Sequence, residues 1–403
     1  MSEQDEMTID ERRKYLHKMW GQYRDASKQE KGQMLDDMEH VTGLNRKSII
    51  RILNGRLSRK KRTKQRGPTY GTEVINAAIK ISKALDYPCA ERLKPNLVFM
   101  AKHMANHDQL SIGSATLKKL ETISVSTLKR ILVNINKSTE KIARKRFHKR
   151  KRNTFKESFP MRKIPYDIPE PGHFEVDLVL HCDENNTGDY IHTLQMIDVA
   201  TGWCEIQAVF GRSYRVMQDG FDHMLLNLPI PVLELHPDNG NEFFNHHLLR
   251  FWKDKIPGLT ISRSRPYHKN DNRFVEENNC SLVRAYIGHG RLDTLSHLLI
   301  LRDIYKDLVY YHNFFQPVMK MIHKVQIDEM LYRRVFDCAR PPLDRLAETG
   351  ILTDAQIDSL FSLRDQVDIL ALRERLENNI THLWCVKTPK IATTVNIFDT
   401  LRK

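Results

Sequence analysis

The 403-residue sequence lacks the features of several protein classes. Its six cysteines are scattered, and no two of them lie two to four residues apart, which excludes zinc ribbons and CxxC redox pairs. No run of about 18 apolar residues occurs, so we expect no membrane span. The acidic, polar N-terminal stretch has no apolar segment typical of a secretory signal. These absences predict a cytoplasmic protein with reduced thiols.

The length and the charge distribution predict several domains with different tasks. A chain of 403 residues exceeds one ordinary domain, and its 40% apolar residues suffice for hydrophobic cores. Residues 1–170 carry 38 Lys and Arg against 19 Asp and Glu, whereas residues 171–403 have a net charge of −5. This asymmetry predicts that the N-terminal part binds a polyanion, for which nucleic acid fits best. The alternative is a basic surface that only keeps the protein soluble.

Residues 30–55 have the pattern of a helix-turn-helix unit. Apolar residues mark one face of a first helix, the stretch Thr42-Gly43-Leu44 interrupts it, and Asn45 can cap a second helix that ends near Gly55. We expect three basic side chains on the exposed face of the second helix, available to phosphates or base edges: Arg46, Lys47 and Arg51. The alternative is an ordinary helical hairpin.

A basic arm and a second helical unit follow. Residues 55–67 are strongly basic, which is typical of a segment that lies along DNA or of a solvated linker. The cations of this arm that we expect to contact DNA are Arg59, Lys60, Lys61 and Arg62. Residues 115–136 repeat the helix-turn-helix pattern, with Ser126 as the expected cap and Lys129 and Arg130 exposed. The sequence therefore predicts a DNA-binding domain over residues 1–67 and a second one over residues 68–140.

Residues 141–170 have the composition of a linker. The stretch 141–152, KIARKRFHKRKR, is the densest basic run in the sequence, and prolines at positions 160, 165, 169 and 171 break any helix that follows. We expect contacts to DNA from the end of the basic run, at Lys149, Arg150, Lys151 and Arg152. The alternative is a solvated helix face or linker without a partner.

Beyond residue 171 the pattern becomes that of a mixed α/β sheet with helices on its faces. Three strands joined by tight turns are followed by alternating helices and strands. The expected strands lie at 173–180, 190–203, 204–211, 232–236 and 259–266, and the expected helices at 214–228, 246–255 and 274–288. A further helix over residues 297–316 is rich in aromatic residues, which favours a core position. We expect this domain over residues 171–325 and a helical C-terminal region over residues 326–403.

Three acidic residues lie at separate strand or helix edges of this domain. Asp177 lies within the first strand, Asp238 follows the fourth strand, and Glu276 begins a helix. Carboxylates in this arrangement suit Mg²⁺, which keeps several waters and accepts phosphate oxygens as further ligands. Two such ions about 4 Å apart would clamp the attacking and leaving oxygens of a phosphoryl transfer. The alternative is three unrelated acids among the 50 Asp and Glu of the sequence.

The stretches that contain these acids resemble the DDE transposases of the retroviral-integrase type. The matching stretches are FEVDLV, MIDVATGW, HPDNGNEF and RPYHKNDNRFVEENN, and the three acids are separated by 61 and then 38 positions. The resemblance covers about residues 171–290. It implies a ribonuclease H-like catalytic core in which Asp177, Asp238 and Glu276 are catalytic and bind two Mg²⁺ or Mn²⁺ ions. In the family the glutamate directly follows the valine, which selects Glu276 over Glu277.

The same resemblance implies a transposase that binds terminal inverted repeats, hydrolyses a phosphodiester and transfers the DNA end to a target. Its partners would be double-stranded DNA and further copies of the chain, with no membrane. Two departures stand out: residues 272–274 replace a glycine common in the family, and Cys and His do not form the zinc-binding domain of viral integrases. The second departure favours a bacterial, nucleoid-associated insertion-sequence transposase. The alternatives are a transposase-derived DNA-binding regulator and a ribonuclease H-like nuclease without strand transfer.

Overall fold

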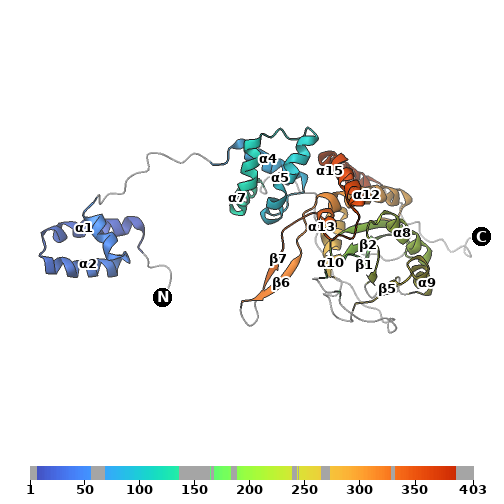
Figure 1. Cartoon of the computed structure of the whole chain (residues 1–403), viewed down its shortest axis with the longest axis horizontal. Helices are drawn as coiled ribbons and strands as arrows, with labels where there is room; N and C mark the ends of the chain where they lie inside the picture. The colour runs from blue at the N-terminus through green and yellow to red at the C-terminus, as the bar shows by residue number, and fades with distance from the viewer. Residues whose placement is uncertain are drawn as a thin grey trace, which may run out of the picture. The chain divides into compact units, whose positions relative to one another are not determined.

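The computed structural model describes residues 7–55, 69–135, 164, 168–182, 188–237, 243, 245–264, 273–327 and 332–386, except the side chains at 134, 135 and 278 (Figure 1). The chain divides into two compact units, residues 1–69 and 70–403. Several residues predicted to be functional lie outside the described residues. They are Asp238 and the cations Arg59, Lys60, Lys61, Arg62, Lys149, Arg150, Lys151 and Arg152.

The described part of the first unit, residues 7–55, contains three helices around a small apolar core. These are α1 (Ile9–Asp25), α2 (Lys28–Thr42) and α3 (Arg46–Leu53). Gly43 ends α2 with φ at 63°, a left-handed conformation that glycine adopts without steric cost. Asn45 then caps α3, because its side chain accepts a hydrogen bond from the backbone N–H of Lys47 at 3.0 Å. The two helices and the glycine turn expected over residues 30–55 are therefore present.

The second unit begins with four helices that pack against one another and against the C-terminal half. They are α4 (Thr72–Ala84), α5 (Ala90–Asn106), α6 (Ser114–Thr122) and α7 (Val125–Ile135). The expected cap at Ser126 is wrong, because α7 begins at Val125 and already includes Ser126; Ser124 Oγ instead accepts from the N–H of Thr127 at 3.1 Å. The Tyr311 hydroxyl donates to the carbonyl of Ala84 at 2.7 Å. These helices thus share one hydrophobic core with the α/β domain.

The α/β domain is built on a five-stranded mixed sheet. Its strands are β1 (His173–Leu180), β2 (Ile191–Asp198), β3 (Cys204–Phe210), β4 (Glu234–Pro237) and β5 (Thr260–Ile261). The order is β3-β2-β1-β4-β5; β2 is antiparallel to both neighbours, whereas β4 is parallel to β1 and β5. This topology confirms the expected ribonuclease H-like sheet. The fifth strand is shorter than predicted; just beyond it, Ser262 donates its backbone N–H to the Leu235 carbonyl at 3.0 Å and its hydroxyl to Glu234 at 2.6 Å.

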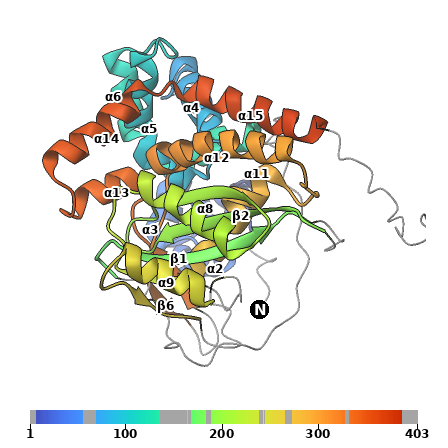
Figure 2. The same cartoon turned by 90° about the vertical axis from the view of Figure 1, so that its right-hand side faces the viewer.

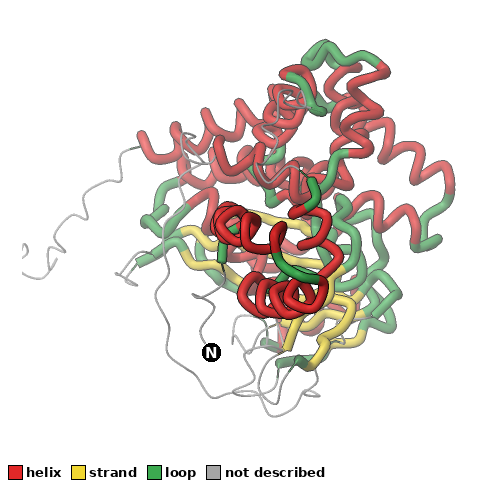
Figure 3. Tube along the Cα trace, turned by 90° about the vertical axis from the view of Figure 1, so that its left-hand side faces the viewer, coloured by secondary structure: helices red, strands yellow, loops and turns green. Residues whose placement is uncertain are grey.

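Helices cover both faces of the sheet (Figures 2 and 3). On one face lie α8 (Tyr214–Asn227) and α9 (His246–Lys255). On the other lie α10 (Arg273–Asn278), the π-helical segment η1 (Asn279–Arg284), α11 (Ala285–Ile287) and α12 (Leu295–Phe315). Gly220 lets α8 approach the sheet closely, since a Cβ atom there would lie 2.8 Å from Val209 Cγ1.

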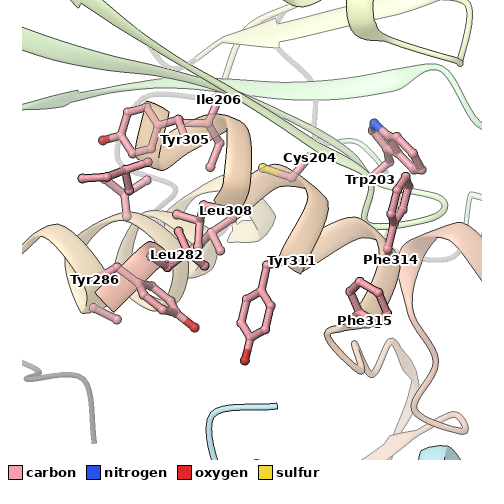
Figure 4. Close-up of a cluster of buried hydrophobic side chains, with 14 of the residues drawn as sticks. Trp203, Cys204, Ile206, Leu282, Tyr286, Tyr305, Leu308, Tyr311, Phe314 and Phe315 are labelled. Atoms are coloured by element: carbon pink, nitrogen blue, oxygen red, sulfur yellow. The ribbon is translucent and has the colours of Figure 1, made fainter. Parts of the chain in front are cut away.

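The core between the sheet and α12 is aromatic, as the sequence predicted. Along α12, the buried Phe314 lies beside Trp203, and the Tyr305 hydroxyl bonds to Thr193 of β2 (Figure 4). Tyr311 and Phe315 are also buried but point away from the sheet, where Phe315 contacts His103 of α5. The side chain of Asn313 joins this helix to the sheet, because it accepts from the Cys204 N–H at 3.0 Å and donates to the Cys204 carbonyl at 2.9 Å. Helix α12 therefore fixes the face of the sheet on which α10 and η1 also pack.

The C-terminal region is mainly helical but begins with a hairpin that the sequence did not predict. The hairpin consists of β6 (Met321–Gln326) and β7 (Tyr332–Phe336), and three helices follow: α13 (Pro342–Glu348), α14 (Asp354–Gln366) and α15 (Ile369–Cys385). The buried Arg345 holds the hairpin base, with bonds to the Asp337 carboxylate at 2.6 Å and the Val318 carbonyl at 2.8 Å. None of the helices in the described part of the chain combines the length and hydropathy that a membrane span requires.

Candidate active site

Asp177 lies on the central strand β1 and faces the helix that follows the fifth strand. Its side chain is half-buried. Oδ1 accepts a hydrogen bond from the backbone N–H of Leu178 at 2.8 Å, and Oδ2 accepts one from the Asn279 side chain. Asn279 is the first residue of the π-helical segment η1, and such segments occur frequently at functional sites. The predicted aspartate is therefore held between a strand and an irregular helix.

The strand register relates the two predicted aspartates. Val176 of β1 is paired with Pro237 of the parallel strand β4. These are the residues immediately before Asp177 and Asp238, although Asp238 itself lies outside the described residues. In open α/β sheets, sites gather at the carboxyl ends of neighbouring parallel strands. The pairing is consistent with the expectation that both aspartates belong to one site.

Glu276 lies on α10, which packs against β1. It follows the buried Val275 and is itself exposed, as is its neighbour Glu277. Glu276 lies three residues before Asn279, and residues three apart share one side of a helix. Helix α10 carries Glu276, and η1 continues it. The side of this helical segment that contacts Asp177 through Asn279 is therefore also the side of Glu276.

Glu175 is a buried carboxylate at this site that sequence reasoning missed. It lies two residues before Asp177 and therefore on the same face of β1. Its Oε2 atom accepts from the backbone N–H groups of Phe274 at 2.7 Å and Val275 at 3.0 Å. Burial raises the pKa of this carboxyl to about 7. An acid at an inward position of a buried strand was the signal available in the sequence.

A network of buried polar side chains joins β4 to its neighbours, β1 and the segment of β5. The sequence did not reveal this network. Glu234 Oε2 bonds to His173 Nδ1 of β1 at 2.8 Å, and Glu234 Oε1 accepts from Ser262 Oγ at 2.6 Å. Ser262 Oγ also lies 2.7 Å from Nδ1 of His236. All four side chains are buried or mostly buried. This network fixes the strand that ends immediately before Asp238.

The structure separates the predicted DNA-binding cations of the described helices into two kinds. Arg46 forms an ion pair with Asp36 and donates to the Gly32 carbonyl at 3.2 Å, so it joins α3 to α2. Lys129 similarly forms an ion pair with Glu91 at 2.8 Å. The remaining three cations are exposed and form no ion pair with any described residue; they are Lys47, Arg51 and Arg130.

The described residues alone do not complete a metal site. No group of three His, Cys, Asp or Glu side chains among them is arranged to hold a metal ion. The predicted set includes Asp238, which is not among them. None of the six cysteines, all of which lie in the described part of the chain, forms a disulfide. Within the described part of the chain, two of the three predicted carboxylates are therefore carried by elements in direct contact.

The sheet topology and the helix packed beside Asp177 define a domain with the ribonuclease H-like fold of integrase catalytic cores. The chain belongs to the same family as the uncharacterized protein y4rM of Sinorhizobium fredii (strain NBRC 101917 / NGR234). The two are 30% identical over 329 residues, which cover 81% of this chain and 92% of that protein. No protein-family model matches the sequence.

Three solved structures are similar to the chain at low levels. The HTLV-2 integrase catalytic core domain in complex with magnesium is 14% identical, with 37% of this chain and 90% of that chain covered and a TM-score of 0.28. The simian T-cell lymphotropic virus intasome in complex with PP2A regulatory subunit B56 gamma is 14% identical, with 54% and 69% of the two chains covered and a TM-score of 0.30. The catalytic core domain of BIV integrase is 17% identical, with 36% and 86% of the two chains covered and a TM-score of 0.27. Because these TM-scores are low, the fold assignment rests on the order and directions of the strands.

Proposed function

We propose that this protein is a DNA transposase that binds terminal inverted repeats and catalyses metal-dependent hydrolysis and strand transfer of DNA ends. The observation that carries the proposal is the attachment of η1 to β1 through Asn279 and Asp177. This contact joins the helix of Glu276 to the strand of Asp177, and the pairing of Val176 with Pro237 supports the addition of Asp238. The same three residues were selected by the motifs in the sequence.

Asp177, Asp238 and Glu276 would hold two Mg²⁺ or Mn²⁺ ions. The donor set fits such ions, because all three ligands are carboxylates and Mg²⁺ prefers oxygen ligands together with waters and phosphate oxygens. Bound ions would activate the attacking hydroxyl and stabilise the leaving oxygen. The chain's own contribution is to hold the carboxylates in place: Asn279 and the Leu178 N–H orient Asp177, and the Glu234 network fixes β4.

DNA binding is assigned to the first unit and the basic segments. Lys47 and Arg51 on α3 are the cations we expect to reach phosphates or base edges, and Arg130 on α7 is a further candidate. Arg46 and Lys129 would have to exchange their intramolecular ion pairs for DNA. Cleavage and joining of two element ends implies a homo-oligomer on DNA.

The proposal is tested with duplexes taken from the DNA that flanks the reading frame. The wild-type chain is expected to nick these duplexes with Mg²⁺ and to stop with chelator, while DNA binding persists. Asp177→Asn is expected to abolish nicking, whereas Asp189→Asn, at an exposed position outside the site, is the matched control. Binding without nicking by the wild type would favour a DNA-binding regulator, and nicking without strand-transfer products would favour a nuclease.

A further inference from the structure

Glu175 holds the start of the helix that carries Glu276. Its Oε2 atom accepts both backbone N–H groups at the beginning of α10, from Phe274 at 2.7 Å and from Val275 at 3.0 Å. Its Oε1 atom is buried and has no hydrogen-bond partner in the described part of the chain. Burying a carboxylate costs free energy that two hydrogen bonds only partly offset. A carboxylate retained here at such a cost calls for a role besides packing.

Two further contacts continue the attachment along the same strand. The Asn279 side chain donates to Asp177, and Arg284 Nη2 donates to the Leu180 carbonyl at 2.6 Å. The attachment points follow the same order on both elements: residues 175, 177 and 180 on the strand, and residues 274–275, 279 and 284 on the helical segment. The helical segment therefore lies alongside β1 in a fixed register.

We propose that Glu175 is a positioning residue, which sets the depth and rotation of α10 so that Glu276 faces the site at Asp177. The inference rests on the proposed function, in which Glu276 is a metal ligand. A helix displaced by one residue turns by about 100°. Such a displacement would move Glu276 away from Asp177 and bring a neighbouring side chain toward it. The bonds to Phe274 and Val275 oppose this displacement, since they fix the two residues directly before Glu276.

The hydrogen bonds that Glu175 accepts from α10 determine which substitutions at position 175 are informative. A carboxylate accepts two N–H groups and is favoured by the partial positive charge of a helix N-terminus. Glu175→Gln keeps an acceptor oxygen at the same position, whereas Glu175→Ala removes it. Glu205 provides the matched control: it is a buried carboxylate of the same sheet that accepts from Trp203 Nε1 at 2.9 Å. Glu205→Ala therefore removes a comparable group that does not touch α10.

The experiment compares the full-length variants by amide hydrogen exchange and by single-turnover cleavage at saturating DNA. For Glu175→Ala we expect faster amide hydrogen exchange in residues 273–287. We also expect the rate of cleavage to fall at least about tenfold with unchanged DNA affinity, because the loss of a hydrogen bond to a charged group has an effect of this size. Glu175→Gln is expected to restore both readouts to near the wild-type values. Glu205→Ala is expected to leave exchange in residues 273–287 unchanged.

The inference is overturned if Glu175→Ala exchanges in residues 273–287 like the wild type, or if it cleaves at the wild-type rate. Equal losses in Glu205→Ala would also overturn it, because they would show a general effect on stability. If Glu175→Ala does not fold, Glu175→Asp, which keeps the charge but shortens the side chain, must show the same faster exchange. A wild-type chain that cannot cleave would refute the proposed function alone, since hydrogen exchange still decides whether Glu175 holds the helix.

Discussion

The side-chain amide of Asn279 donates a hydrogen bond to the carboxylate of Asp177. This contact distinguishes the two adjacent glutamates of α10. Successive helical residues project about 100° apart, so Glu276, three residues before Asn279, lies about 60° from it. Glu277, two residues before Asn279, lies about 160° away by the same measure. The side of the helix that meets Asp177 is therefore the side of Glu276.

We predict that Glu276→Gln abolishes end cleavage and strand transfer, whereas Glu277→Gln keeps most activity. Only the first substitution removes a carboxylate from the side of α10 that meets β1. The second removes an exposed acid near a helix N-terminus, worth a few tenths to about 1 kcal/mol of stability. Single-turnover cleavage of uncut and pre-cut end DNA measures both effects. The reverse ranking would move the catalytic assignment by one residue, and mild effects from both would remove α10 from the active site.

We predict that Lys47→Ala and Arg51→Ala each weaken binding to end DNA. The logarithm of the affinity falls linearly with the logarithm of the salt concentration. If the substitution removes a phosphate contact, this slope becomes shallower by about one. A lost base contact costs about 1–3 kcal/mol and relaxes sequence preference at one position. Fluorescence anisotropy with end and random duplexes at several salt concentrations distinguishes the two. Lys18→Ala, at an exposed position on α1, is the control. An equal loss of affinity in this variant would mean that α3 binds DNA only as part of a general basic surface.

We predict that Glu205→Gln makes the stability of the protein less dependent on pH between about 5 and 8. Burial raises the pKa of the Glu205 carboxyl from 4.5 to about 7. Between these values the folded chain binds a proton that the unfolded chain has released, so stability falls as pH rises through this window. The loss levels off about one pH unit above 7 and is on the order of 3 kcal/mol, since one pKa unit corresponds to about 1.4 kcal/mol.

Glutamine has no proton to lose and keeps the acceptor for Trp203. We therefore expect the wild type to lose more unfolding free energy than Glu205→Gln when the pH is raised from 5 to 8. The stability of the variant relative to the wild type is then greater at pH 8 than at pH 5. Urea unfolding at both pH values measures this difference. The same difference at pH 5 and pH 8 would mean that Glu205 titrates normally in the folded chain.

The sequence by itself determined most elements of the α/β domain and their order. Apolar runs bounded by turn residues located β1 to β4, which are buried on both faces, and helical spacing located α8, α9 and the helical segments from α10 to α12. The sequence predicted Asp177 and Glu276 as site residues because one lies within a strand-like run, the other begins a helix, and both belong to recognisable motifs. The start of α14 is likewise set locally, by a capping box between Thr353 and Gln356, which lie three residues apart.

Tertiary structure alone decided which residues support the site. Glu175 and Asn279 are about 100 positions apart in the sequence, and their roles depend on α10 and η1 lying along β1. The hairpin β6–β7 was missed because its strands expose mixed apolar and basic side chains, so no buried face imposes a clear alternation. Arg46 was predicted to face DNA, but its ion pair with Asp36 depends on how α3 packs on α2. Sequence periodicity reports which face of an element is buried, whereas partners across elements are set by packing that no local pattern encodes.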